Sequence, residues 1–114
     1  MTNLKVGDRV RLTGGYEPEP KWLCGQDFYE GEVITFLSIK EETPLAVVRL
    51  DKPISFNKIT GDILVLKLRY VDASWHETAI VQAYLYDFVP KDPVFLHCDS
   101  PNYIESHVSY DVIP

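Results

Sequence analysis

Three polar residues in the second half of the chain, Asp72, Ser74 and His76, are of the types that form a hydrolytic triad. On one strand they would share a face, with successive neighbours about 7 Å apart. In a triad, however, the histidine lies between the nucleophile and the acid, so that it can bond to both. Here the serine is in the middle, and no glycine-flanked nucleophile turn surrounds it. The spacing therefore favours a polar strand end, and we expect no enzymatic activity.

His97 and Cys98, with the distant His107 and Cys24, are the residues that could hold a metal ion. Structural zinc sites use four nitrogen or sulfur ligands, often in closely spaced pairs, and no such pair occurs here. Adjacent residues on a strand point to opposite faces, so His97 and Cys98 would not bind one ion together. Phosphate-binding glycine motifs are also missing. We expect no metal or cofactor and two reduced thiols, although spacing alone leaves a Cys24–Cys98 disulfide open.

Aromatic residues give the strongest indication of a binding site. Tyr16, Trp22, Phe28 and Tyr29 lie in a long connection over residues 14–30, and Trp75 follows the fourth apolar run. Such side chains supply flat apolar area with a polar end, which suits a groove for extended, proline-rich peptides. The alternative is that they only pack the connection and the end of the chain onto the domain, as most aromatic residues do.

The charge balance argues against a nucleic-acid partner. Seventeen acidic and eleven basic residues give a formal net charge of −6, which repels phosphate backbones. The only small basic groups are Lys5 with Arg9 and Arg11, and Lys67 with Arg69. Nucleic-acid binding through these five side chains is kept as the alternative function, and salt-sensitive RNA binding would favour it.

The elements that must position these residues are strands. Apolar residues alternate, or run continuously with β-branched and aromatic side chains, in five segments bounded by glycine and proline: 5–13, 31–39, 45–51, 63–71 and 78–89. No window shows a capped helical stripe. At 114 residues, with 46% hydrophobic and 25% charged residues, the chain has the composition of one globular domain. We expect an all-β fold, either a small barrel or a sandwich.

The last part of the chain breaks this rhythm. Residues 91–114 contain several prolines but are too apolar for a solvated linker. We expect residues 1–90 to form the barrel and residues 91–114 to lie on it as an ordered, extended tail, with a short strand at 94–97. This tail could itself occupy the aromatic groove.

Some of the predicted strands carry apolar residues at both odd and even positions, and therefore on both faces of the sheet. The expected core positions are the alternate apolar residues of three segments: Val6, Val10 and Leu12; Ala46, Val48 and Leu50; and Leu64, Leu66, Leu68 and Tyr70. Leu45, Val47, Ile63 and Val65 fall opposite to these positions. Either the tail covers them or a second copy of the chain does. Because homodimers are the commonest soluble oligomers, we predict self-association.

The first half of the chain resembles the SH3-like small barrels. The resemblance is carried by residues 5–12 (KVGDRVRL), a long loop, residues 31–34 (GEVI) and residues 46–51 (AVVRLD). It is nearest to the group that contains the small E-type protein of photosystem I and the ferredoxin–thioredoxin reductase variable chain, with KOW and Tudor-like barrels next. The resemblance implies a five-stranded barrel that serves as a docking or stabilising module, usually without catalysis. The chain is longer than these barrels and shows no clear match after residue 52.

These observations lead to one functional expectation. The chain has no apolar run long enough to cross a membrane and no apolar leader, so we expect a cytoplasmic protein. Its function is expected to be non-catalytic binding of a protein or peptide, with Tyr16, Trp22, Tyr29 and Trp75 forming the binding face.

Overall fold

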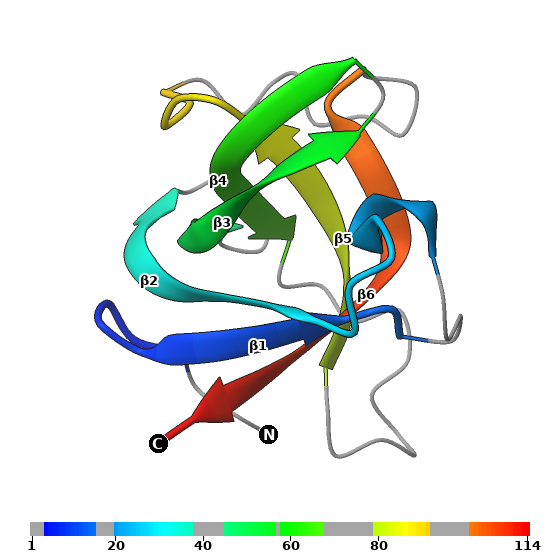
Figure 1. Cartoon of the computed structure of the whole chain (residues 1–114). Coiled ribbons are helices and arrows are strands. Elements are labelled where there is room, and N and C mark those ends of the chain that lie inside the picture. Colours follow the sequence, from blue (N-terminus) through cyan, green and yellow to red (C-terminus); the bar gives the residue numbers. More distant parts are fainter. Residues whose placement is uncertain (1–3, 16–19, 38–44, 57, 68–78, 92–100) are drawn as a thin grey trace.

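Six antiparallel strands form one closed barrel in this computed structural model, which describes residues 4–15, 20–37, 45–56, 58–67, 79–91 and 101–114 (Figure 1). Neighbours in sequence are neighbours in the barrel, and the last strand pairs with the first. The strands are β1 (Arg9–Thr13), β2 (Tyr29–Leu37), β3 (Leu45–Phe56), β4 (Ile59–Lys67), β5 (Ala79–Tyr86) and β6 (Tyr103–Ile113). One turn of 3-10 helix, η1 (Lys21–Leu23), lies between β1 and β2. The all-β small barrel expected from the sequence is confirmed.

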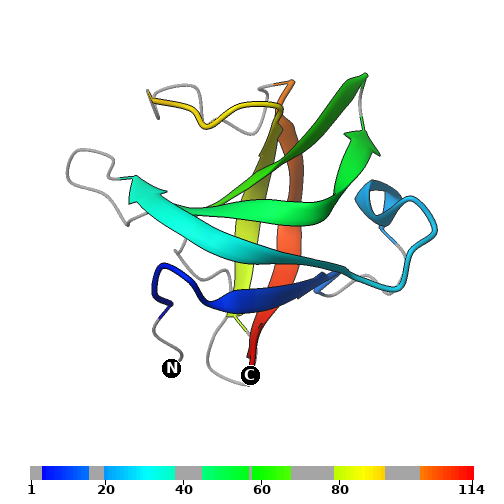
Figure 2. The same cartoon turned by 60° about the vertical axis from the view of Figure 1, so that its left-hand side comes forward.

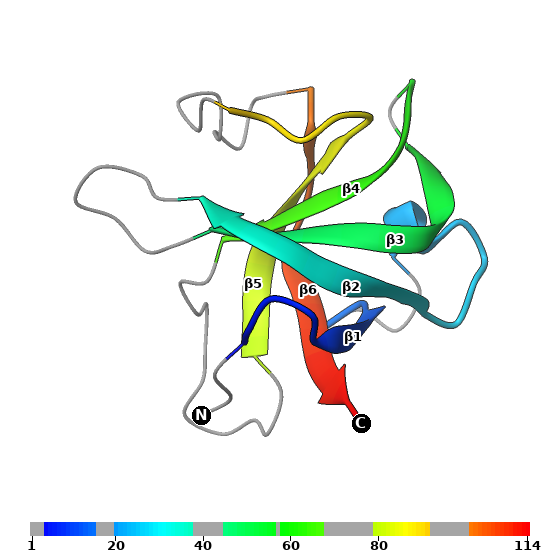
Figure 3. The ribbon, with the colours of Figure 1, turned by 90° about the vertical axis from the view of Figure 1, so that its left-hand side faces the viewer.

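The expected tail is the sixth strand of this barrel, which corrects the prediction of five strands. β6 pairs with β1 from Arg9–Ile113 to Thr13–Ser109 and with β5 on its other side (Figure 3). The prolines that argued against a long element, Pro90, Pro93, Pro101 and Pro114, all lie outside β6. Without β6, the facing sides of β1 and β5 would be free edges, so its pairing closes the sheet. The predicted short strand at 94–97 lies outside the described residues.

Alternating residues fill the barrel interior, as the period of two predicts. Val10 and Leu12 of β1 and Ala46, Val48 and Leu50 of β3 are at most 4% exposed and belong to one core cluster. Leu64 and Leu66 of β4, Val81, Ala83 and Leu85 of β5, and Ile104 and Val108 of β6 complete the same layer. The inward face was therefore predicted correctly for β1, β3 and β4, with one exception: Val6 precedes β1 and is 61% exposed. Leu68 and Tyr70 lie outside the described residues.

A second apolar cluster lies on the outer face of the barrel wall. Leu45, Val47, Ile63 and Val65 are 0–3% exposed and pack with tyrosines Tyr84 and Tyr86 of β5. All of this area is buried within a single chain, so these side chains give no reason to expect a second copy. Self-association stays a prediction that these residues do not support.

A β-bulge explains why β2 is apolar on both parities. The register with β3 shifts between Val33 and Thr35, which places one extra residue in β2. Val33 and Phe36 consequently pack on the inner cluster, whereas Ile34 and Leu37 pack on the outer one. β2 thus contributes to both clusters.

β2 and β3 separate where the barrel meets η1. Their pairing ends at Gly31 and Leu50, although β2 begins two residues earlier and β3 continues to Phe56. A Cβ atom on Gly31 would lie 2.5 Å from the carbonyl oxygen of Arg49, so only glycine allows the two backbones to approach this closely. Beyond this point β3 bends away, and η1 lies in the opening between the two strands (Figure 2).

Candidate functional site

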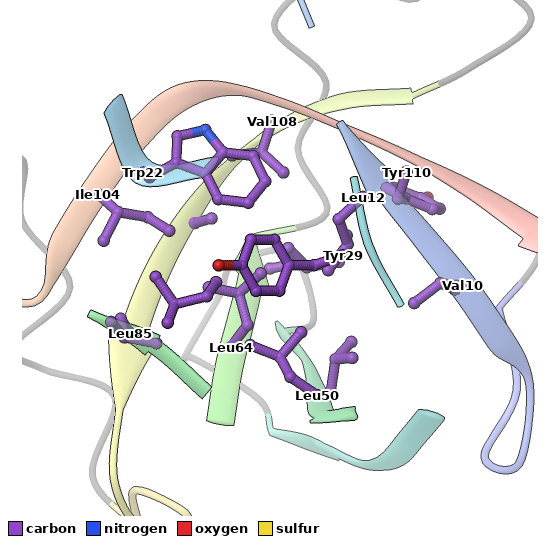
Figure 4. Packing of buried hydrophobic residues seen from close by; sticks show 14 of the residues in the cluster. Val10, Leu12, Trp22, Tyr29, Leu50, Leu64, Leu85, Ile104, Val108 and Tyr110 are labelled. Atoms are coloured by element: carbon purple, nitrogen blue, oxygen red, sulfur yellow. The ribbon is translucent and has the colours of Figure 1, made fainter. Parts of the chain in front are cut away.

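The structure places two of the four predicted binding residues in the core. Trp22, in η1, is fully buried, and Tyr29, at the start of β2, is 7% exposed. Their ring centroids are 6.2 Å apart, and Trp22 lies beside Ile104 and Val108 of β6 (Figure 4). These two aromatics therefore pack the connection onto the barrel and do not form an open groove. Tyr16 and Trp75 lie outside the described residues.

Local hydrogen bonds fix η1 in the opening. The backbone N–H of Cys24, which has a left-handed conformation with φ of 54°, donates to the carbonyl oxygen of Lys21 at 3.1 Å. The free thiol of Cys24 donates to the carbonyl oxygen of Ser55 in β3, also at 3.1 Å. η1 is thereby tied to the second half of β3, while its tryptophan fills the barrel end.

A surface pocket of about 390 Å³ lies where β2 and β3 separate. Its wall on the β2 side is formed by Gln26, Asp27, Phe28, Tyr29 and Glu30, and its wall on the β3 side by Asp51 and Lys52. The Phe28 side chain is 42% exposed at this pocket, whereas the next residue is buried. We call these seven residues the Phe28 pocket.

The sequence places Phe28 among the aromatic residues of the connection, but Phe28 was not one of the four predicted binding residues. Phe28 directly precedes β2, and Tyr29 is the first residue of that strand. Neighbouring residues of an extended chain point to opposite faces, which favours burial of only one of these two aromatics. The sequence contains no sign of which one, because both residues are aromatic and follow an irregular connection.

Two arginines of β1, Arg9 and Arg11, contact the residues that line the pocket. The Arg11 guanidinium lies 4.4 Å from the centroid of the Phe28 ring, a cation–π distance. Its Nε and Nη2 atoms both donate to Oε2 of Glu30, at 2.9 and 2.7 Å. Arg9 lies 3.8 Å from the other oxygen of Glu30 and forms a two-pronged ion pair with Asp51, including an Nη1–Oδ1 bond of 3.0 Å. Three strands are linked across the outer wall in this way.

The hydrogen bond from Arg9 lowers the pKa of the Asp51 carboxyl below its usual value, and the Arg9 charge adds to this effect. Burial raises the pKa of the Tyr29 hydroxyl, so this group remains neutral at physiological pH. Two charged residues of the pocket stand outside the ion pairs: Asp27 and Lys52 are exposed, and neither forms an ion pair with any other described residue.

The residues considered for catalysis or metal binding are mostly outside the described parts of the chain. These are Asp72, Ser74, His76, His97 and Cys98. Within the described ranges, no group of three histidine, cysteine or acidic side chains could hold a metal ion. The expectations of no catalysis and no metal therefore stay predictions.

The basic groups considered for nucleic-acid binding are only partly available. Arg9 and Arg11 are both engaged by carboxylates of β2 and β3. Lys5 and Lys67 are described, whereas Arg69 is not. Charges already paired with carboxylates attract phosphate less strongly, since the local positive potential is cancelled.

Comparison of the chain with protein-family models, with curated proteins and with solved structures finds no match. No helix among the described residues is long and apolar enough to span a membrane. The Phe28 pocket is therefore the feature of the molecule that bears most directly on function.

Proposed function

We propose that this chain is a protein- or peptide-binding module without catalysis of its own, and that the Phe28 pocket is its recognition surface. The observation that carries the proposal is the exposed Phe28 ring, held under the Arg11 guanidinium at a pocket of about 390 Å³. A pocket of this size is at the small end for ligand sites, which suits one or two side chains of a partner.

Preorganisation supports this function. An aromatic side chain that is already fixed loses little conformational entropy on binding, and aromatic residues dominate the binding energy of many interfaces. Arg11 fixes one face of the Phe28 ring and is itself held by Glu30. Tyr29 lines the pocket and packs against Trp22, and both belong to the buried core of the barrel.

The proposed recognition surface keeps part of the predicted aromatic binding face and adds Phe28 to it. Tyr29 remains a lining residue and Trp22 becomes its support, while Phe28 supplies the exposed ring. The roles of Tyr16 and Trp75 stay predictions. A cytoplasmic location also remains part of the proposal.

Affinity capture with matched variants tests the proposal. Wild type, Phe28→Ala and Phe88→Ala would be immobilised and exposed to a lysate of the source cells, with and without nuclease. Phe88 is the matched control because it is 58% exposed and does not line the pocket. We expect a protein that wild type and Phe88→Ala retain and that Phe28→Ala loses.

Two results would contradict this expectation. Recovery of the same proteins by all three forms would show that the Phe28 pocket is not the recognition surface. Recovery that depends on nucleic acid and falls with added salt would support the alternative function instead. Equal denaturation midpoints for the three forms would establish that Phe28→Ala acts on binding and not on folding.

A further inference from the structure

The charges of the Phe28 pocket point to the chemistry of its ligand. We propose that the pocket binds an extended peptide segment in which an apolar residue is flanked by a basic residue on one side and an acidic residue on the other. The basic residue would pair with Asp27 and the acidic residue with Lys52. This inference rests on the proposed function and adds the class of segment that is recognised.

Only some of the charges at the pocket are available to a ligand. Asp51 is engaged by Arg9 through both of its oxygens, and Glu30 accepts two hydrogen bonds from Arg11. Opposite charges bonded in this way contribute little net potential to the pocket. Asp27 and Lys52 also line the pocket, and neither has an ion-pair partner among the described residues. Among the residues that the structure describes, the pocket therefore presents one negative and one positive charge that have no ion-pair partner.

These two charges belong to different segments of the chain, which separate at the pocket. Asp27 comes just before β2, and Lys52 lies in β3. Both residues lie beyond Gly31–Leu50, the last pair that β2 and β3 form. The exposed Phe28 ring belongs to the same wall as Asp27. A ligand that crosses the pocket therefore meets a carboxylate on one wall and an ammonium group on the other, with apolar area available at Phe28.

An extended peptide fits this arrangement of charges better than a nucleic acid does. A segment with one charge of each sign satisfies both walls, whereas a nucleic-acid strand carries only negative charges and would be repelled by Asp27. The net charge of −6 also favours the approach of partners with a basic surface. Complementary charges on two walls further define the direction in which the segment lies.

Selection from a displayed library of random dodecapeptides tests this inference. The baits are wild type, Phe28→Ala and a charge-exchanged variant, Asp27→Lys with Lys52→Asp. A second exchange at exposed residues that do not line the pocket, Asp87→Lys with Lys91→Asp, is the control and keeps the same net charge. Affinities of selected peptides would be measured at low and high salt, beside a single-stranded oligonucleotide of about the same length.

We expect peptides selected on wild type to share the basic–apolar–acidic pattern in one direction. Their affinity should fall about tenfold or more on the charge-exchanged variant, because like charges would then face each other. That variant should instead select peptides with the two charges in the reverse order. The control exchange should bind the wild-type peptides unchanged, and Phe28→Ala should lose them.

Two different failures can be told apart. Peptides that need Phe28 but show no charge pattern, or that bind the charge-exchanged variant equally well, would overturn this inference and leave the proposed function in place. Failure to select any peptide that depends on Phe28, or binding of the oligonucleotide in its place, would overturn both.

Discussion

The two ends of the β2–β3 strand pair differ in structure, because the strands are paired at one end and separated at the other. At its closed end, residues 31–37 pair with residues 45–50, and side chains are buried on both faces of the wall. At its open end, where Phe28, Glu30, Asp51 and Lys52 lie, the strands have separated and every one of these side chains is at least partly exposed. The difference shows how a single barrel wall combines a double-sided core with a surface pocket.

The transition between the two ends depends on backbone geometry. The closed end has apolar neighbours above and below the sheet, so pairing is reinforced by burial on both faces. At the open end β3 loses its register with β4 between Arg49 and Ile54, and it bends away from β2. η1 lies between the separated strands (Figure 2), and the Phe28 pocket is lined by the residues just before and at the start of β2 and by two residues of β3.

The largest expected effect tests whether the outer cluster of the closed end is a true core. Leu45 lies in the outer cluster and Leu64 in the inner one, and both are fully buried. We expect Leu45→Ala and Leu64→Ala each to lower the free energy of unfolding by about 2–5 kcal/mol, measured by urea denaturation. Phe28→Ala, at the open end, removes a partly exposed ring and its contact with Arg11, and should change it by about 1 kcal/mol or less. A similarly small effect of Leu45→Ala would remove the comparison between the two ends.

A smaller effect is expected at the junction between the two ends. Gly31→Ala would place a Cβ atom 2.5 Å from the carbonyl oxygen of Arg49 and 2.7 Å from Cγ1 of Val48. Relief of this overlap requires the backbones to move apart, which should cost about 1–3 kcal/mol of unfolding free energy. Glu32→Ala, at an exposed position next to it, is the control and should change stability by about 0.5 kcal/mol or less. Wild-type stability of Gly31→Ala would show that the close approach is not needed.

The smallest expected effect concerns the ion pairs of the open end. The pKa of Asp51 is lowered by its hydrogen bond from Arg9, so this pair stabilises the fold above the ordinary carboxyl pKa. Its contribution should disappear as pH falls through the lowered pKa of Asp51, because the carboxyl is then protonated. Titration of Asp51 by NMR should show a higher pKa in Arg9→Gln than in wild type.

Two checks accompany this titration. Lys91→Gln, which removes an exposed positive charge outside the Arg9–Asp51 pair, should leave the Asp51 pKa unchanged. Added salt should raise the wild-type value, because the pair is exposed to solvent. An Asp51 pKa that is the same in wild type and Arg9→Gln would mean that the ion pair does not form in solution.

Much of the architecture could be predicted from local patterns. The alternation of Ala46, Val48 and Leu50 identified the inward face of β3, since a strand buries every second residue. β6 could not be recognised in the same way, because prolines flank it on both sides, although none lies between Tyr103 and Ile113.

The candidate site was harder to predict. Trp22 and Tyr29 were correctly placed in one aromatic group, but their burial depends on η1 entering the barrel end.

The amino-acid sequence by itself determined that this is an all-β chain with a net charge of −6, and which residues of β1, β3 and β4 face inward. These properties follow from residue type and a period of two, which are local. Only the tertiary structure decided that β6 closes the barrel, that Leu45 and Val47 belong to a second core, and that Phe28 is exposed while Tyr29 is not. Each of these depends on contacts between segments far apart in the chain, whose pairing no local pattern specifies.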